Sequence, residues 1–227
     1  MNSNSILTLL PDRVNDTDES MVAAAVYVEA GEAAHAALII RHNGEARAFH
    51  FFKKVLLEVP EILEEDQILI FVKELDFIPS EMVASFLAHC EIIKEQANPT
   101  FGFFYDARSF YDATGNYQNP SNFPEYMSCV GFCLTVIQSY LVEEQFLQYD
   151  DWDHTTYNLS AERMAYEMSY IARNYPEVNP DDIEKAVRRI LPVEYFSAAY
   201  SDKRPVRKAF TDQHIVEIID EISRRVA

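Results

Sequence analysis

The first third of the chain alternates short apolar runs with turn residues, a pattern that predicts a β-sheet. The segments with the length and composition of strands are 22–28, 34–42, 45–52, 55–59 and 67–73. Asn43-Gly44 separates the second segment from the third, and this dipeptide favours a two-residue hairpin turn because both turn positions need a positive φ. Pro60 ends the fourth segment, since proline has no N–H to donate to a neighbouring strand.

Helical spacing of apolar residues follows from residue 80 onward. Helices are expected over 80–97, 129–147, 160–175 and 211–226. The segment 179–182, NPDD, predicts the start of another helix, because it combines a capping side chain, an early proline and acids in the first turn. Residues 98–127 are rich in Asn, Pro, Gly and Tyr and predict a long loop, in which 101–105 is compatible with one more strand.

Because strands precede residue 75 and helices follow residue 80, the sequence predicts an α+β fold. We expect a polar lead-in over 1–20, a main domain over 21–150 and a helical C-terminal extension over 151–227. In the last helix, the isoleucines at helical spacing are expected to face the core: Ile215, Ile218, Ile219 and Ile222.

The chain is strongly acidic, with 37 Asp and Glu residues against 19 Lys and Arg residues and a formal net charge of −18. This charge argues against binding of nucleic acids or anionic membranes, whose phosphates it would repel, and is compatible with a basic substrate or partner. The segment 203–208, KRPVRK, is a basic cluster that reads either as a solvated connector or as a docking site for an acidic partner.

The sequence also bears on the compartment. The N-terminal residues lack the features of a signal peptide, and no apolar stretch approaches the length of about 18 residues that a transmembrane helix requires. The chain has three cysteines, which is too few for a disulfide framework. A cytoplasmic protein is therefore expected.

The hairpin makes a specific prediction about two histidines. With a two-residue turn, Ala37 lies opposite His50 and His35 lies opposite Phe52. His35 and His50 then become diagonal neighbours on one face of the sheet, where a hydrogen bond can join their rings. That is the arrangement of a general base and the residue that orients it.

Cys129 is the candidate nucleophile, because it stands in the first turn of an expected helix, directly after the capping residue Ser128. The helix dipole stabilises a thiolate there, so a lowered thiol pKa is expected, and the Cys129 N–H is a candidate oxyanion donor. The alternative is an ordinary core cysteine, which is our interpretation of Cys90 and Cys133. A zinc site is a further alternative, built from Cys129, Cys133, His35 and His50.

The order of these residues resembles a known family. The segment 128–132, SCVGF, is similar to the Asp-Cys-Ser-Gly-Phe motif around the nucleophile of NlpC-type cysteine peptidases. Here the histidine precedes the cysteine, which resembles the circularly permuted branch that includes the lecithin retinol acyltransferase-like proteins and the YaeF/YiiX-type amidases. That branch has a histidine opening a strand, a hairpin with a second polar residue, and a distant cysteine heading a helix, and His35, His50 and Cys129 follow this order. The segment 102–106 also resembles the Gly-x-x-Tyr-Asp stretch of the YiiX type.

The resemblance implies a permuted papain-like α+β fold, in which an antiparallel sheet packs on the nucleophile helix. It implies a cysteine peptidase or amidase. Because the sequence shows no export signal, we expect an intracellular enzyme that cleaves a peptide or isopeptide bond of a peptide or protein substrate, without a cofactor or metal. Cys129 would be the nucleophile, His35 the base and His50 the residue that orients it, with Tyr105 positioning the oxyanion or the substrate. The alternatives are a thiol acyltransferase and a non-catalytic protein-binding module on the same scaffold.

Overall fold

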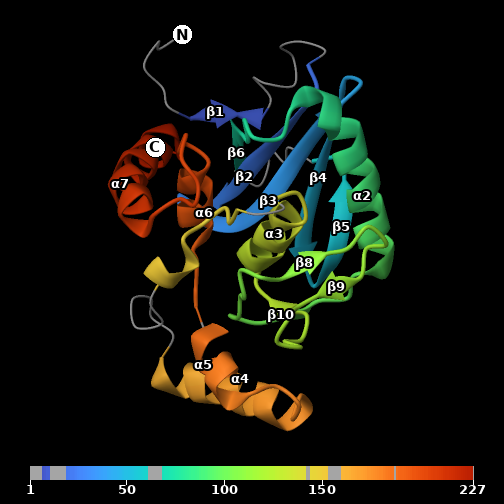
Figure 1. Cartoon of the computed structure of the whole chain (residues 1–227). Helices are drawn as coiled ribbons and strands as arrows, with labels where there is room; N and C mark the ends of the chain where they lie inside the picture. Colours follow the sequence, from blue (N-terminus) through green and yellow to red (C-terminus); the bar gives the residue numbers. More distant parts are fainter. Residues whose placement is uncertain are drawn as a thin grey trace.

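A six-stranded antiparallel sheet forms the centre of the computed structural model, which describes residues 7–10, 19–60, 68–141, 144–152, 160–186 and 188–226. The strands run in the order β1-β6-β2-β3-β4-β5 (Figure 1). Their bounds are β1 Thr8–Leu9, β2 Met21–Glu29, β3 Glu32–His42, β4 Glu45–Phe52, β5 Lys54–Glu58 and β6 Leu69–Glu74. The five strands predicted before residue 75 all form, and β1 adds an edge strand that the sequence pattern did not indicate.

The β3–β4 hairpin has the predicted register, from the turn down to the pair Leu38–Phe49. Both turn residues have a positive φ, as the Asn-Gly dipeptide favours. On its other side, β3 has a register shift against β2 that leaves Ala34 without a partner residue. Such a bulge bends a strand locally, and here it lies next to His35 at the end of the sheet where the hairpin opens.

The helices of the described residues are α2 Val83–Gln96, α3 Cys129–Gln138, α4 Ala161–Asn174, α5 Pro180–Ala186, α6 Pro192–Ala198 and α7 Lys208–Val226. Short 3-10 turns occur at Ser80–Met82 and Tyr149–Asp151. The prediction that the 129–147 helix continues to residue 147 is wrong. Helix α3 ends at Gln138, whose side chain donates to the carbonyls of Leu141 and Glu144. Helix α6 was not predicted, because its 7 residues are too few to display a helical period.

The prediction of one more strand at 101–105 is also largely wrong. Only Thr100–Phe101 forms a strand, β7, which pairs in parallel with β10 Tyr126–Met127. Gly102 follows this strand, and glycine is required there because a Cβ would lie 1.8 Å from the ring of Tyr126. A second small ribbon joins β8 Phe110–Tyr111 to β9 Tyr117–Gln118. The rest of the long loop is therefore held by side-chain contacts rather than by a ladder.

The two faces of the central sheet bury different side chains. One face carries the main core, in which residues such as Val26, Leu38 and Phe49 pack under α2, α3 and α6. The other face buries mostly small residues of β2, β3 and β4: Ala23, Ala25, Ala37, Ile39 and Ala48. By strand alternation, His35 and His50 belong to this second face, at the end of the sheet where β3 begins and β4 ends.

The helices after residue 160 contribute in two ways. Helices α6 and α7 join the main core through side chains that include Tyr195, Phe196 and Ile222. Helices α4 and α5 form a separate cluster with the loop residues Phe104, Phe123 and Tyr126, and Figure 1 shows them apart from the sheet. In α7 the prediction for one isoleucine is wrong, since Ile219 is 46% exposed.

The basic cluster at 203–208 forms ion pairs within the chain. Arg207 pairs with Asp151 at 2.5 Å, and Lys208 lies 2.6 Å from Asp212. Arg204 lies over the ring of Phe77, 4.5 Å from its centroid. These contacts fasten the segment before α7 to the main core and favour the connector interpretation. Among the residues that the structure describes, no helix has the length and apolarity needed to cross a bilayer.

Candidate active site

His35 on β3 and His50 on β4 form the predicted pair. His35 Nε2 lies 2.8 Å from His50 Nδ1, and the ring centroids are 5.0 Å apart at an interplanar angle of 75°. The contact follows from the hairpin register, which sets the two residues diagonally on one face. Tyr27 on β2 packs against both rings, edge-on to His35 and stacked on His50, and contributes to their burial.

Glu58 on β5 extends the pair into a chain of three side chains, and sequence patterns did not identify it. His50 Nε2 lies 3.1 Å from Glu58 Oε1. The β4–β5 register places Glu58 opposite Ala48, so its side chain is a diagonal neighbour of His50 on the same face. The His50 side chain is 8% exposed and that of Glu58 is 52% exposed, so the chain of contacts runs from the interior to the surface.

These contacts fix the tautomers of both histidines. An ionised Glu58 carboxylate only accepts hydrogen bonds, so His50 Nε2 carries the proton. A neutral His50 then has a bare Nδ1, which accepts from His35 Nε2–H. A neutral His35 consequently has its lone pair on Nδ1. The hydrogen-bonded side chains of Glu58, His50 and His35 therefore leave one ring nitrogen ready to accept a proton, and that nitrogen is His35 Nδ1.

Burial keeps both rings neutral. It lowers the pKa of His35 to about 4, with the neighbouring His50 acting in the same direction. Burial also lowers the pKa of His50, against the opposing effects of the hydrogen bond and the charge of Glu58. At neutral pH, His35 is therefore in the protonation state of a general base.

Cys129 heads α3, and Ser128 caps the helix as predicted, its Oγ accepting from the Gly131 N–H at 3.2 Å. The expectation of a lowered thiol pKa is not met. Burial raises the pKa of the Cys129 thiol, while the backbone N–H groups of Ala36, Val130 and Cys129 and the charge of Arg189 act in the opposite direction. The N-terminal helix dipole does not overcome desolvation here, so the thiol rests in its neutral form.

Cys129 and His35 line one cavity of about 330 Å³. The Ala36 N–H that affects the thiol belongs to the residue directly after His35, so the sulfur lies beside the β3 backbone at this point. The other lining residues come from β3, the end of β4 and the residue after it, β7 and the loop after it, the start of α3, and the segment that leads into α6: Ala34, Phe51, Phe52, Lys53, Phe101, Phe103, Ser128, Val130, Arg189, Ile190 and Pro192. His50 does not line the cavity; it contacts His35 on the sheet face opposite the one that packs under α3.

Tyr105, the expected oxyanion or substrate group, is not among the residues that line this cavity. It is 7% exposed and belongs to the main core. Its ring packs edge-on against Tyr149, and the Tyr149 hydroxyl donates to the Tyr105 carbonyl oxygen. Burial raises the pKa of its hydroxyl well above the ordinary value. The structure therefore gives Tyr105 a packing role.

Cys90 and Cys133 are buried in the main core, as predicted. Burial raises the pKa of both thiols well above the ordinary value. Within the described ranges, no three His, Cys, Asp or Glu side chains converge closely enough to hold a metal ion, so the four residues of the zinc alternative are not arranged as a site.

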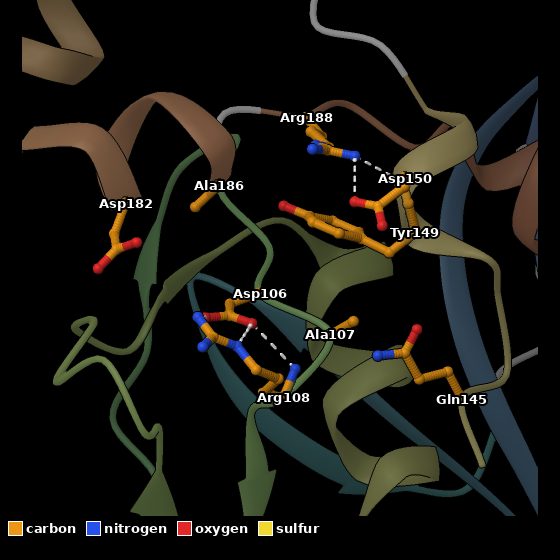
Figure 2. Close-up of a pocket in the computed structure, with 9 residues that line it drawn as sticks. All are labelled: Asp106, Ala107, Arg108, Gln145, Tyr149, Asp150, Asp182, Ala186 and Arg188. Carbon is orange, nitrogen blue, oxygen red and sulfur yellow. Dashed lines mark hydrogen bonds and ion pairs between the residues drawn. The ribbon is translucent and has the colours of Figure 1, made fainter.

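A second cavity of about 290 Å³ lies between the loop after β7 and the segments around α5 (Figure 2). Figure 2 shows Asp106 joined to Arg108 on one wall and Arg188 joined to Tyr149 and Asp150 on the other. The Arg108 guanidinium donates to both carboxylate oxygens of Asp106, at 2.9 and 2.6 Å. No cysteine or histidine of the described residues lines this cavity, so it lacks the nucleophile and base that the first cavity combines.

No known protein family, curated protein or solved structure matches the chain.

Proposed function

We propose that the chain is a cysteine hydrolase that cleaves an amide bond, either peptide or isopeptide. The observation that carries the proposal is that Cys129 and His35 line one cavity while His35 Nε2 is hydrogen-bonded to His50. Cys129 would be the nucleophile and His35 the general base. His50 and Glu58 would be positioning residues, because they hold His35 in the tautomer whose free nitrogen is Nδ1.

The reaction would begin from a neutral thiol and a neutral imidazole. His35 Nδ1 takes the proton of the Cys129 thiol as sulfur attacks the substrate carbonyl carbon, and a tetrahedral oxyanion forms. The C–N bond then breaks as the imidazolium returns that proton to the leaving nitrogen, which leaves a thioester on Cys129. Water, deprotonated by His35, hydrolyses the thioester and restores the thiol. Burial of both groups favours this neutral resting pair over an ion pair.

Backbone groups are the proposed oxyanion donors in place of Tyr105. The N–H groups of Ala36, Val130 and Cys129 all act on the Cys129 sulfur. Two of them belong to the first turn of α3, where backbone N–H groups have no partner inside the helix. An oxyanion next to the sulfur would accept from the same groups.

The resemblance to permuted NlpC-type peptidases supports this proposal through chain order. A histidine on a strand precedes a cysteine at a helix start, and that helix, α3, packs on an antiparallel sheet. We accordingly propose the permuted papain-like arrangement for residues 21–150.

The test is capture of the acyl-enzyme. Incubation of the chain with a panel of peptide and isopeptide esters and amides, followed by intact-mass and peptide mapping, is expected to find a thioester on Cys129. Cys129→Ser and His35→Ala variants provide the comparison. A substrate turned over equally well by the wild type and by Cys129→Ser would contradict the proposal.

The second candidate is a binding module without turnover. It is favoured by the raised pKa of the Cys129 thiol and by the lack of a hydrogen bond between Cys129 and His35 among the described residues. It predicts that Cys129→Ala keeps full affinity for a partner and that no panel substrate is consumed.

A further inference from the structure

The Cys129 cavity has the opposite charge from the rest of the chain. Acidic residues outnumber basic ones by 37 to 19 overall, yet the cavity is lined by Lys53 and Arg189 and by no carboxylate of the described residues. Neither cation forms an ion pair with a carboxylate in the described part of the chain. The cavity wall therefore presents two positive charges that no carboxylate of the described residues neutralises.

Aromatic rings hold both cations at the cavity. Lys53 Nζ lies 5.5 Å from the centroid of the Phe52 ring, and Arg189 Cζ lies 5.2 Å from that of Phe103. Lys53 also has a φ of 61° at the tight connection from β4 to β5. Gly or Asn adopts that backbone conformation with less strain, so the local fold does not explain a lysine there.

The remaining wall of the cavity is mostly apolar. Phe51 and Ile190 are 2% and 5% exposed, and Phe101, which is 51% exposed, lies at the rim. The volume of about 330 Å³ is near the lower end of the range of small-molecule sites. This size suits one apolar group and its immediate neighbours, so the occupant inside is small.

We propose that the Cys129 cavity binds a small amide substrate that carries an apolar group and a carboxylate close to the scissile bond. The apolar group would pack among the phenylalanine rings, and the carboxylate would accept hydrogen bonds from Lys53 and Arg189. This inference rests on the proposed hydrolase and names its substrate class. It replaces the expectation of a basic substrate, which came from net charge, because two cations in the cavity lining disfavour a cationic ligand.

The first experiment uses alkylation of Cys129 and requires no turnover. Iodoacetate is an anion, whereas iodoacetamide is neutral. The initial rate of Cys129 alkylation by iodoacetate, divided by the rate with iodoacetamide, therefore reports the electrostatics of the cavity, and peptide mass spectrometry measures both rates. The ratio is expected to fall on the order of tenfold in the Lys53→Gln/Arg189→Gln double variant. Lys54→Gln is the matched control, because Lys54 is exposed on β5 outside the cavity lining, and its ratio should equal that of the wild type.

The second experiment uses N-acetylphenylalanine as a probe that protects Cys129 from iodoacetamide. N-acetylphenylalaninamide lacks the carboxylate and N-acetylalanine lacks the ring, and each is expected to protect on the order of tenfold less well. A Lys53→Arg/Arg189→Lys variant keeps both charges and should retain protection, which separates loss of charge from loss of folding.

The outcomes distinguish this inference from the proposed function. If N-acetylphenylalanine protects Cys129 through the two cations but no amide is hydrolysed, the hydrolase fails and the binding preference stands. If amides are hydrolysed but the three probes protect equally, or the alkylation ratio is unchanged in the double variant, the substrate class is wrong and the hydrolase stands.

Discussion

The two cavities differ in what their charged side chains bind. In the cavity of Figure 2, Arg108 and Arg188 each contact a carboxylate of the same chain, so the charges hold loops together. In the Cys129 cavity, Lys53 and Arg189 lie over aromatic rings and form no ion pair with a carboxylate of the described residues. The comparison indicates how two kinds of charged side chain can be told apart. Those paired with a carboxylate of the same chain stabilise the fold, and those without such a pair are available to a ligand.

The largest expected effect comes from His35→Ala. The variant removes the nitrogen that accepts the thiol proton, so the rate of amide hydrolysis should fall on the order of 10²–10⁴-fold. Arg108→Gln, in the other cavity, should keep the rate within about threefold, since its contacts are structural. Steady-state kinetics on a substrate from the panel measures both. Equal losses in the two variants, with intact folding by circular dichroism, would remove the distinction between the cavities.

The loss of activity at low pH tests whether His35 is the general base. The pKa of His35 is lowered to about 4, below its ordinary value, so the ring becomes protonated only as the pH falls toward 4. Activity is thus expected to persist below pH 6 and to be lost as the pH approaches 4. A profile of kcat/KM against pH measures this loss. An acid limb near the ordinary histidine pKa of about 6.5 would mean that His35 is not the base.

Cysteine reactivity gives the next largest contrast. Cys90 and Cys133 are fully buried, whereas Cys129 lines a cavity. Limited iodoacetamide should label Cys129 on the order of a hundredfold faster than the other two, which need local opening of the core. Because burial raises the pKa of the Cys129 thiol, its labelling rate should still be rising above pH 8. A plateau below pH 7 would indicate the thiolate that was expected from the helix position alone.

The sequence predicted those parts of the site that depend on short-range rules. The Asn43-Gly44 turn determines the register of one hairpin, and the register places His35 beside His50. A capping serine before an apolar run likewise located the start of α3. Both inferences use the spacing of residues that are close in the chain, where backbone geometry leaves few alternatives.

The missed parts depend on a tight connection without a recognisable turn motif, or on contacts between distant segments. Glu58 meets His50 only because β4 and β5 connect through a single residue, Lys53, which no turn motif indicated. Arg189 reaches the cavity from more than a hundred residues beyond His35. The direction of the Tyr105 side chain was likewise set by its packing on Tyr149, and the thiol pKa by the burial of Cys129. Local patterns contain no information about these encounters.

Asp106→Asn tests whether the paired charges in the cavity of Figure 2 stabilise the fold. Burial alone would raise the pKa of Asp106, but hydrogen bonds and the charge of Arg108, with a further bond from Asn119, outweigh it and hold the pKa below its ordinary value. The carboxylate therefore stabilises the fold above the unfolded-state pKa of about 4, and this contribution is lost as the pH falls through the folded-state pKa.

Replacement by Asn should lower the free energy of unfolding by about 1.5–3 kcal/mol at pH 7. The difference from the wild type should shrink as the pH is lowered toward 3. Urea unfolding at several pH values measures it, and Asp150→Asn, on an exposed side chain of the same cavity, is the control. A loss of stability that does not vary with pH would contradict a role for the charge.

The smallest effect is expected at Glu58, and it tests whether the tautomer argument is correct. In Glu58→Gln the amide oxygen still accepts from His50 Nε2–H, so the free nitrogen of His35 remains Nδ1 and hydrolysis should fall less than about threefold. In Glu58→Leu no acceptor remains, and His50 is free to carry its proton on Nδ1 instead. That proton would face His35 Nε2, force His35 to protonate Nδ1 and remove the base, so the rate should fall on the order of tenfold.

Because only the fraction of molecules in the wrong tautomer is inactive, kcat should change and KM should not. The 15N shifts of the two imidazoles, which differ between protonated and bare nitrogens, give a readout that simple loss of packing would leave unchanged. Equal 15N shifts in the wild type and in Glu58→Leu would mean that Glu58 does not set the tautomer, and the chain of three would reduce to the histidine pair.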